Sequence, residues 1–390
     1  MATTAEQRRA YGGIPLFGLG FRPFFLFAAV WAASALPLWI ASVVGWAPQL
    51  TRDWHVHEML FGYLGGVIAG FLLTAVPNWT GRVPVAGAPL AALFGLWAAG
   101  RVLMLAAPDA GVSAAVDTAF LFVLGLIIAR EVIAGRNLRN APVCVLILVL
   151  AMANALTHFR AFEAELALLG ERIGLGVVAM LVALIGGRIT PSFTRNWMAK
   201  HAVKPEPASP GRFDLIALAV TAVALLSWIV APQLQVAGAA LTIAGALTAM
   251  RLARWQGWRT GAEPLVTILH IGYGWLALAL ALLGASILAP GVVPPTAGVH
   301  ALTAGAFGVM TLAVMTRASL GHTGGPLTAD RATQAVYLLV NLGAALRVAS
   351  PFLPQHYAAL LVVSGLCWGG AFVLFVAGYG PLLLRARRQA

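Results

Sequence analysis

The feature that most constrains this chain is a repeated pattern of long apolar runs that covers nearly its whole length. A bilayer core of about 30 Å needs roughly 20 apolar residues for one helical span. With 60% hydrophobic and 10% charged residues, the chain lacks the polar surface that a water-soluble domain requires. The sequence therefore predicts an all-α polytopic membrane protein of about twelve transmembrane helices, at residues 21–45, 55–79, 88–107, 111–134, 141–159, 168–190, 213–231, 234–254, 264–288, 297–319, 332–352 and 357–384.

The positively charged residues favour one orientation of these spans. If the N-terminus is cytoplasmic, all but a few of the 25 Lys and Arg residues fall on the cytoplasmic side; the exceptions are Arg52, Arg101, Arg160, Arg172 and Arg347. Cytoplasmic loops of membrane proteins carry an excess of Lys and Arg. We therefore expect both termini in the cytoplasm, and we interpret the net charge of +12 as a topology signal and not as a nucleic-acid surface.

One integral membrane domain over residues 1–390 is expected, without a separate soluble domain. The longest polar connection, about residues 191–212, contains Pro205, Pro207 and Pro210 and is expected in the cytoplasm between two groups of six spans. Phosphate-binding loops, dinucleotide fingerprints and nucleophile elbows are missing from the sequence, which argues against nucleotide-driven and hydrolytic functions. Cys144 and Cys367 both lie in apolar runs and do not form a disulfide framework.

An internal repeat connects the second and the tenth span. His57-x4-Gly62-x2-Gly65 matches His300-x4-Gly305-x2-Gly308, and at the same offset Thr80-Gly81 matches Thr323-Gly324. The sixth span joins more weakly, because residues 191–194 resemble residues 77–80 and Arg188 occupies the place of Arg317. A period of four helices predicts three four-helix repeats in a quasi-threefold bundle, unlike the six-plus-six arrangement of many transporters.

The eight histidines are the natural candidates for chemistry, because ionisable groups inside a membrane are costly and mark functional sites. Two are expected near the cytoplasmic face, His201 and His322, and His270 lies within the ninth span. The others cluster at the outer ends of the second, fifth, tenth and twelfth spans: His55, His57, His158, His300 and His356.

His57 and His300 occupy equivalent positions of the repeat and are predicted to be the axial ligands of a b-type haem. Neutral imidazole ligates haem iron, and two facing helices can supply both axial ligands. The glycines that follow each histidine would leave room for a flat macrocycle. The alternative is that each histidine caps a helix end while the glycines serve helix packing.

Copper is the second predicted metal. Residues two apart on a regular helix point about 200° away from each other, so His55 and His57 can serve different metals. The further candidate ligands are His158, His270, His322 and His356, with Met59 as a soft ligand. The ordinary alternative is that each of these histidines forms a hydrogen bond to a neighbouring helix.

Arginines end the equivalent helices at the inner face. Arg188 and Arg317 are predicted to pair with haem propionates or with an anionic substrate. Contact with lipid headgroups, together with a role in topology, is the alternative.

Several of these segments together resemble one protein family. They are GLGFRPFF at 18–25, WHVHEM at 54–59, TAVPNWTGR at 74–82, GGRITPSFT at 186–194, HALTAG at 300–305 and MTRASLGHTG at 315–324. This set is similar to the NnrS family and extends over nearly the whole chain. The resemblance implies a haem- and copper-containing protein of the bacterial inner membrane that acts in the response to nitric oxide and relieves nitrosative stress, as in denitrifying metabolism.

A second, looser resemblance concerns architecture. The catalytic subunit of haem-copper oxidases is similar in having twelve helices, both termini inside, and haem ligands on the second and tenth helices. This chain departs from that pattern, because its sixth span lacks histidine, its seventh lacks a His-His pair and its tenth has one histidine. Copper would therefore need other ligands, such as His55, His158 or His270.

Three functions stay open from the sequence. In the first, haem b and copper bind or reduce nitric oxide or a nitrosyl species, with electrons from a partner that the sequence does not identify. In the second, the chain is a secondary transporter or a metal or proton pathway without haem; the absence of carboxylates from the middle of the spans weighs against it. In the third, a haem-based sensor binds nitric oxide without turnover.

Overall fold

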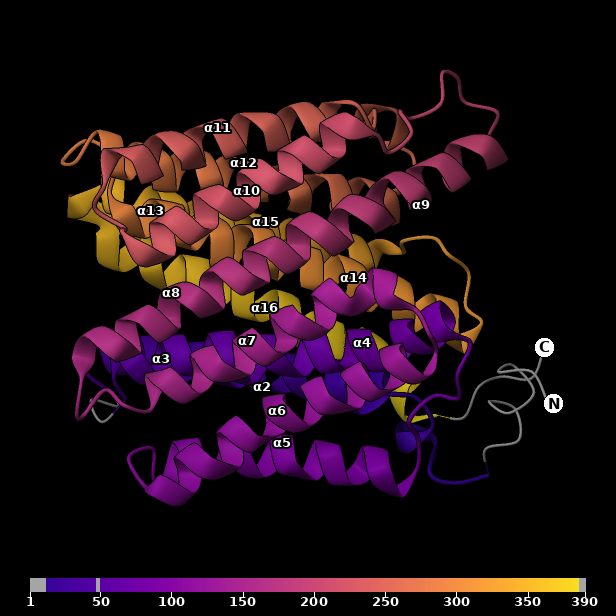
Figure 1. Cartoon of the computed structure of the whole chain (residues 1–390), viewed down its shortest axis with the longest axis horizontal. Coiled ribbons are helices and arrows are strands. Elements are labelled where there is room, and N and C mark those ends of the chain that lie inside the picture. The colour runs from indigo at the N-terminus through magenta and orange to yellow at the C-terminus, as the bar shows by residue number, and fades with distance from the viewer. Residues whose placement is uncertain (1–11, 47–49, 386–390) are drawn as a thin grey trace. The chain divides into compact units, whose positions relative to one another are not determined.

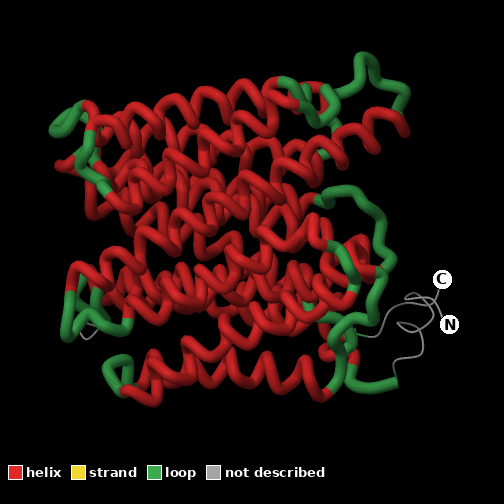
Figure 2. Tube along the Cα trace, viewed as in Figure 1, coloured by secondary structure: helices red, strands yellow, loops and turns green. Residues whose placement is uncertain are grey.

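The computed structural model describes residues 12–46 and 50–385 of the chain. Helices joined by short connections make up the described residues, and no strand occurs among them (Figure 2). The predicted all-α membrane class is therefore confirmed. Arg8, Arg9, Arg387 and Arg388, which contribute to the predicted orientation, lie outside the described residues.

Twelve helices in the described part of the chain are long and apolar enough to cross a membrane, as predicted. In helical spans every backbone hydrogen bond is satisfied within the segment, which is why long apolar runs in lipid become helices. The elements that form them are α2 (Phe21–Val43), α3 (Arg52–His57), η2 (Glu58–Tyr63), α4 (Leu64–Thr80), α5 (Ala88–Ala106), α6 (Gly111–Ala134), η3 (Leu138–Asn140), α7 (Ala141–Thr157), α8 (Ala164–Leu181), η4 (Val182–Gly186), α9 (Gly187–Lys200), α10 (Arg212–Val230), α11 (Gln235–Ala253), α12 (Pro264–Leu288), α13 (Pro295–His300), η6 (Ala301–Phe307), α14 (Gly308–Thr323), α15 (Arg331–Ala349), η7 (Ser350–Phe352), η8 (Pro354–His356) and α16 (Tyr357–Leu384).

The predicted cytoplasmic loop at about 191–212 is wrong at its N-terminal half. The sixth span runs continuously over Ala164–Lys200, so that only residues 201–211 connect it to α10. Pro191 lies inside α9 and does not end it. Prolines are tolerated in membrane helices where the freed backbone groups find other partners.

Contacts divide the chain into two compact units. The first unit comprises residues 1–177, 317–326 and 375–390, and the second comprises residues 178–316 and 327–374. The boundary falls inside α8 and not in the connection after the sixth span, because α8, α14 and α16 each contribute to both units. The expectation of one membrane domain over residues 1–390 stays a prediction.

In the first unit, α4 packs against α2 and α6, α5 packs against α6, and α6 packs against α7. The antiparallel pair α5 and α6 is seen side by side in Figure 1. Phe21, Phe24 and Phe25 of α2 are fully buried in this packing. The unit therefore surrounds the N-terminal half of the second span with α2, α5, α6 and α7.

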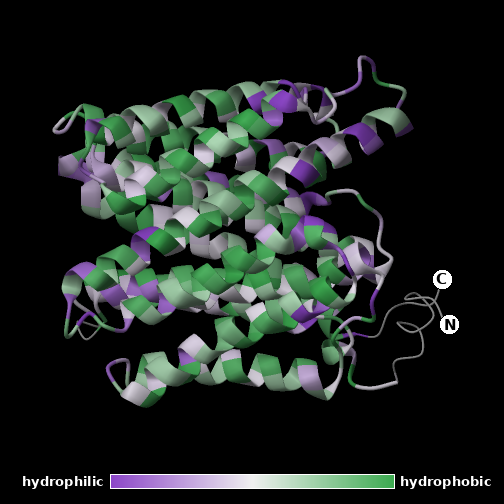
Figure 3. Ribbon diagram, viewed as in Figure 1, coloured by the Kyte–Doolittle hydropathy of each residue, from purple (hydrophilic) through white to green (hydrophobic). Residues whose placement is uncertain are grey.

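In the second unit, α11 packs against both α10 and α12, and α12 also contacts α13 and η6. A buried ion pair holds α10 to α11, since Arg251 donates to Asp214 at 2.8 Å. Hydrophobic residues make up most of the length of the helices, and hydrophilic residues gather toward helix ends and connections (Figure 3). This is the distribution expected of helices that face lipid.

Three π-helical segments interrupt the spans that the sequence repeat connects. They are η2 in the second span, η4 in the sixth and η6 in the tenth. A π-turn loses the regular i to i+4 hydrogen bond and frees a carbonyl. Side-chain donors from neighbouring helices bind these carbonyls: Trp97 binds Gly62 O at 2.9 Å, Arg251 binds Ala183 O at 3.0 Å and Trp368 binds Ala304 O at 3.1 Å.

The repeat extends to the ends of the second and the tenth span. Gly81 and Gly324 directly follow α4 and α14, and both adopt positive φ, at 70° and 84°. Glycine adopts this conformation without the steric cost of a side chain and ends helices in this way. The shared π-turns and glycine ends support the predicted period of four helices, while the quasi-threefold arrangement stays a prediction.

Candidate metal centre

His57 lies at the junction between a short α-helix and the π-helical segment of the second span. Thr51 caps α3 by accepting a hydrogen bond from the backbone N–H of Trp54 at 3.2 Å. One turn further on, His57 ends α3 and is buried, with 6% of its side chain exposed. The wider turn of η2 then turns Glu58 into the protein, where it is fully buried.

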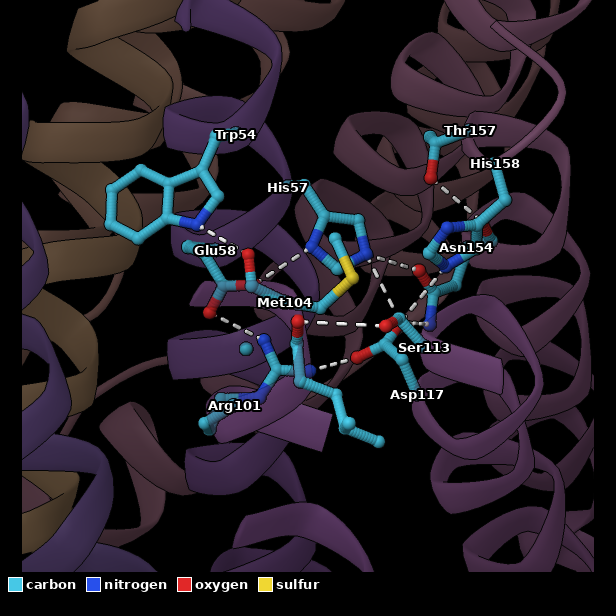
Figure 4. Close-up of polar contacts among 12 residues, drawn as sticks. Trp54, His57, Glu58, Arg101, Met104, Ser113, Asp117, Asn154, Thr157 and His158 are labelled. Carbon is cyan, nitrogen blue, oxygen red and sulfur yellow. Dashed lines mark hydrogen bonds and ion pairs between the residues drawn. The ribbon is translucent and has the colours of Figure 1, made fainter. Parts of the chain in front are cut away.

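Both ring nitrogens of His57 contact oxygen atoms. Nδ1 lies 3.0 Å from Oε1 of Glu58, and Nε2 lies 3.0 Å from Oδ2 of Asp117 and 2.9 Å from Oδ1 of Asn154 (Figure 4). A ring nitrogen that carries a proton can donate to these acceptors. With a metal on Nε2, only the Nδ1 proton is needed, and Glu58 accepts it.

His158 reaches the same carboxylate from the end of α7. Its Nε2 lies 3.2 Å from Oδ2 of Asp117, and its ring centroid is 5.1 Å from that of His57. One ligand atom from each of His57, Asp117 and His158 lies within 4.8 Å of the others. Three helices, α3, α6 and α7, thus bring two imidazoles and one carboxylate to one point.

Arg101 on α5 balances the charge of this cluster. It donates to Oε2 of Glu58 at 2.6 Å and contacts Oδ1 of Asp117, so one guanidinium connects both carboxylates. Asn154 donates to Oδ2 of Asp117 at 2.7 Å and fixes its orientation. Buried charges are stable only when they are paired and hydrogen-bonded, and one guanidinium neutralises one of the two carboxylates. The remaining negative charge favours a metal cation beside His57.

The residues fit a transition-metal ion. Imidazole and carboxylate are ligands for copper, zinc and iron, and a metal-bound histidine commonly donates its other N–H to a carboxylate, as His57 can to Glu58. His158 follows the last residue of the fifth span, and burial lowers its pKa to about 3. Its imidazole is therefore neutral at pH 7 and has a lone pair for a metal.

An ion-pair network links the helix ends that bear these ligands. Arg52, at the start of the second span, binds Glu171 of α8 through both carboxylate oxygens, at 3.0 and 2.8 Å. Arg160, two residues beyond His158, binds Asp53 at 3.1 Å and also contacts Glu171. The network ties the segments on either side of the cluster together and so helps to hold His57 and His158 near each other.

A comparison with protein-family models matches residues 15–387 to the model described as NnrS protein. The chain belongs to the NnrS family. The match covers nearly the whole chain and confirms the family to which the sequence motifs point. No curated protein matches the chain. Membership in the NnrS family fits a role in the response to nitric oxide, and the family is known in general terms for binding metal and haem. The His57–Asp117–His158 group gives this NnrS chain a place for a metal.

The other predicted ligands of this NnrS chain lie in different surroundings. His55 stacks on Trp39, with ring centroids 5.0 Å apart and planes inclined by 11°, whereas His57 turns to the cluster. The two histidines therefore face apart, as their spacing predicts. Met59 follows Glu58 in η2 and is half-buried.

The remaining histidines are spread over the fold. His270 of α12 is buried and its Nε2 lies 2.7 Å from Oγ1 of Thr194. His300 ends α13, is half-buried, and bonds through Nδ1 to Thr296 O at 2.8 Å. His322, in the last turn of α14, packs its ring 5.5 Å from that of Phe21. His356 is exposed in η8.

The predicted haem ligands and propionate partners are not brought together within one unit. His57 belongs to the first unit and His300 to the second, and haem ligation by this pair stays a prediction. Arg188 is exposed on α9 and Arg317 is half-buried on α14. Pairing of these two arginines with haem propionates also stays a prediction.

Four residues of the cluster in this NnrS chain were not predicted as site residues: Glu58, Arg101, Asp117 and Asn154. The prediction considered only carboxylates in the middle of the spans, whereas Glu58 and Asp117 are buried near one end of the spans Arg52–Thr80 and Gly111–Ala134. The available signal was the presence of an acidic residue within the apolar runs at 55–79 and 111–134. Such residues are costly in lipid and call for partners.

Proposed function

We propose that this NnrS family member is a protein of the bacterial inner membrane that holds copper at His57, Asp117 and His158 and binds nitric oxide there. The observation that carries the proposal is the convergence of three ligand atoms within 4.8 Å inside the first unit. Copper is the choice among the metals because it binds such ligands most tightly in the Irving–Williams order and because the resemblance to the family implies it.

The surrounding residues would prepare the site for a small uncharged ligand. Glu58 would accept the Nδ1 proton of His57 and thereby direct Nε2 to the metal. Arg101 and Asn154 would hold Asp117 in place. Three protein ligands would leave a coordination position open for nitric oxide, and a bound metal would supply either electron exchange or simple ligation.

Haem b is the second cofactor of the proposal. At His57 itself the contacts of Nε2 with Asp117 and Asn154 fit a metal ion better than a macrocycle. His300 is the better candidate for haem, because the hydrogen bond from its Nδ1 to Thr296 O makes Nε2 the unprotonated nitrogen. The bis-histidine pair with His57 would require His57 to leave its present partners.

Metal analysis of the purified protein tests this function. Protein purified in detergent from haem- and copper-replete cells is expected to contain copper, to show a b-type difference spectrum, and to change its spectrum when nitric oxide is added. His57→Ala, His158→Ala and Asp117→Asn are expected to lose the copper, and His300→Ala the haem. His201→Ala, which removes a ring that stacks on Trp197 in the second unit, is the matched control.

A second function has one observation in its favour. The buried Glu58, Asp117 and His57 form a connected set of titratable groups within the spans, which is what a proton pathway requires. A colourless, metal-free wild-type protein would eliminate the metal centre and leave this transport function. Copper without any response to nitric oxide would restrict the protein to metal binding.

A further inference from the structure

A second feature of this protein lies in the second unit, in the groove between α11 and α12. The groove has a volume of about 820 Å³. Its lining on α12 runs from Thr267 to Ala281, which corresponds to about 21 Å of helix. Along most of this length the walls are small residues: Gly245, Ala246, Ala249, Gly274, Ala277 and Ala281. A long, narrow, apolar ligand fits this shape.

One end of the groove contains a buried polar group. His270 lines it and is 7% exposed, together with Gly257, Trp258 and Thr267. Nε2 of His270 pairs with Thr194, whereas Nδ1 is buried and has no hydrogen-bond partner among the described residues. A buried imidazole nitrogen without a partner costs free energy, and a ligand atom that pairs with it recovers that cost.

Gly257 packs directly against the ring of His270. A Cβ atom at residue 257 would overlap Cγ and Nδ1 of His270, so only glycine permits the chain to pass so close to the ring. The chain at residue 257 therefore packs directly against the ring, at the end of the groove that His270 lines. Thr267, whose hydroxyl donates to Thr260 O at 2.7 Å, is not a hydrogen-bond partner of Nδ1.

The hydrogen bonds of Thr194 allow two states of His270. The Thr194 hydroxyl donates to Thr190 O at 2.8 Å, so it can accept from Nε2–H of His270 and leave Nδ1 as an acceptor. In the other tautomer Thr194 donates to Nε2, and Nδ1–H becomes a donor. In the first tautomer Nδ1 accepts a hydrogen bond from a hydroxyl head group, and in the second Nδ1–H donates one to a carbonyl.

The charge of the groove restricts the ligand class. No lysine, arginine or acidic residue is among its lining residues. A phosphate or a carboxylate would be buried there without a cation, which is unfavourable. The ligand therefore has an uncharged head group with a hydroxyl or a carbonyl and a long apolar tail.

We propose that the groove binds a lipid-soluble quinol or quinone, with its ring oxygen on Nδ1 of His270 and its isoprenoid tail along the small residues of α11 and α12. A quinol hydroxyl and a quinone carbonyl match the two tautomers of His270. The binding itself is independent of the proposed metal centre. Its consequence, that a quinol is the class of electron donor for nitric oxide chemistry, rests on the proposed function.

The test measures binding of decylubiquinone to the full-length protein in phosphatidylcholine nanodiscs, through quenching of tryptophan fluorescence. Trp258 lines the groove and Trp255 packs near His270, so a bound quinone ring is expected to quench them. Saturable binding is expected in the wild-type protein. His270→Ala is expected to weaken it at least tenfold, and Ala249→Phe, which fills the tail region, by a similar factor.

Matched substitutions separate binding from misfolding. Ala239→Phe places the same side chain at an exposed position of α11 outside the groove and is expected to bind quinone like the wild-type protein. Thr194→Val removes the partner of Nε2 and is expected to weaken binding by a smaller factor than His270→Ala. Non-saturable quenching, equal affinity in all variants, or a haem or phospholipid that stays in the groove in place of quinone would overturn the proposal. Because no metal is needed for this binding, its failure leaves the proposed metal centre untouched.

Discussion

Arg101 donates a hydrogen bond of 2.6 Å to Glu58, and this contact joins α5 to the π-helical segment that follows His57. The same guanidinium contacts Asp117, the residue on which His57 and His158 converge. A single buried arginine therefore orients the groups on both sides of the candidate metal centre. Its position explains how two carboxylates remain inside membrane spans.

Removal of Arg101 is expected to destabilise the protein strongly. Arg101→Leu would leave Glu58 and Asp117 buried without their cation, and breaking a buried ion pair by removal of one partner costs about 3–5 kcal/mol. Thermal unfolding of the metal-free protein in detergent measures this change. Arg130→Leu, at a side chain that is 68% exposed, is the control and is expected to change stability by less than about 1 kcal/mol. Equal unfolding temperatures of the two variants would contradict the assigned role of Arg101.

Glu58→Gln and Asp117→Asn are expected to differ in their effects on metal binding. Asp117 is a proposed ligand, and its loss is expected to abolish stoichiometric copper. Glu58 is not a proposed ligand but accepts from His57 and orients it. Loss of a residue that orients a metal ligand commonly reduces metal affinity 10- to 100-fold. Titration of copper against a competing chelator measures both affinities. If Glu58→Gln abolished binding while Asp117→Asn kept it, the ligand assignment would be wrong.

Trp368→Phe tests the binding of π-helix carbonyls by side-chain donors. The variant would leave Ala304 O of η6 without its indole donor, and an unsatisfied buried carbonyl costs about 1–3 kcal/mol. Trp97→Phe is expected to act in the same way at Gly62 O. Thermal unfolding relative to Trp46→Phe, a position that is 86% exposed, measures the difference. No loss of stability in either buried variant would show that these hydrogen bonds contribute nothing.

Asp330 is expected to make the start of α15 sensitive to acid. It caps the helix by accepting from the backbone N–H of Thr333 at 2.8 Å. Hydrogen bonds from the Thr333 hydroxyl and backbone lower the pKa of Asp330 from 3.8. Because the pKa is lower in the folded state, the carboxylate stabilises the helix above pH 3.8, and this stabilisation is lost as the pH falls through the lowered pKa.

Hydrogen exchange of the amides at 331–335 measures this effect. In the wild-type protein, the protection of these amides relative to an unstructured chain at the same pH is expected to fall in acid. In Asp330→Asn the protection is expected to stay constant, because the asparagine cap does not titrate. Asp330→Ala is expected to cost about 1 kcal/mol of local stability at neutral pH. Identical pH profiles of the wild-type protein and Asp330→Asn would refute the prediction.

Cysteine labelling tests the orientation in the membrane. The distribution of Lys and Arg predicts that residues 201–211 are cytoplasmic and that the connection after His158 is outside. In a background without Cys144 and Cys367, Phe162→Cys is expected to react with a membrane-impermeant maleimide in spheroplasts, because residue 162 is 87% exposed. Ser209→Cys, also at an exposed position, is expected to react only after the membrane is permeabilised. The reverse pattern would invert the predicted topology.

The sequence by itself determined the number of spans and most of their bounds. The twelve apolar runs correspond to the twelve helices within a few residues, except at the sixth span, which continues to Lys200. This success has a simple cause, since a backbone in lipid must satisfy its own hydrogen bonds and an apolar run of sufficient length has no other stable state. The period of four helices could also be predicted from the sequence, because the repeated residues lie at the π-turns and glycine ends of the equivalent spans.

Only the tertiary structure decided which histidines meet. His57, Asp117 and His158 belong to three different spans, and their approach depends on the rotation of each helix about its axis and on the π-turn after His57. Arg101 comes from a fourth span, α5. Spacing along the sequence reports which residues share a face of one helix, but not which faces of different helices touch. The acidic side chain of Asp117 within an apolar run indicates that it needs a partner. Its actual partners, and the part that Asn154 plays among them, followed only from the packing of the helices.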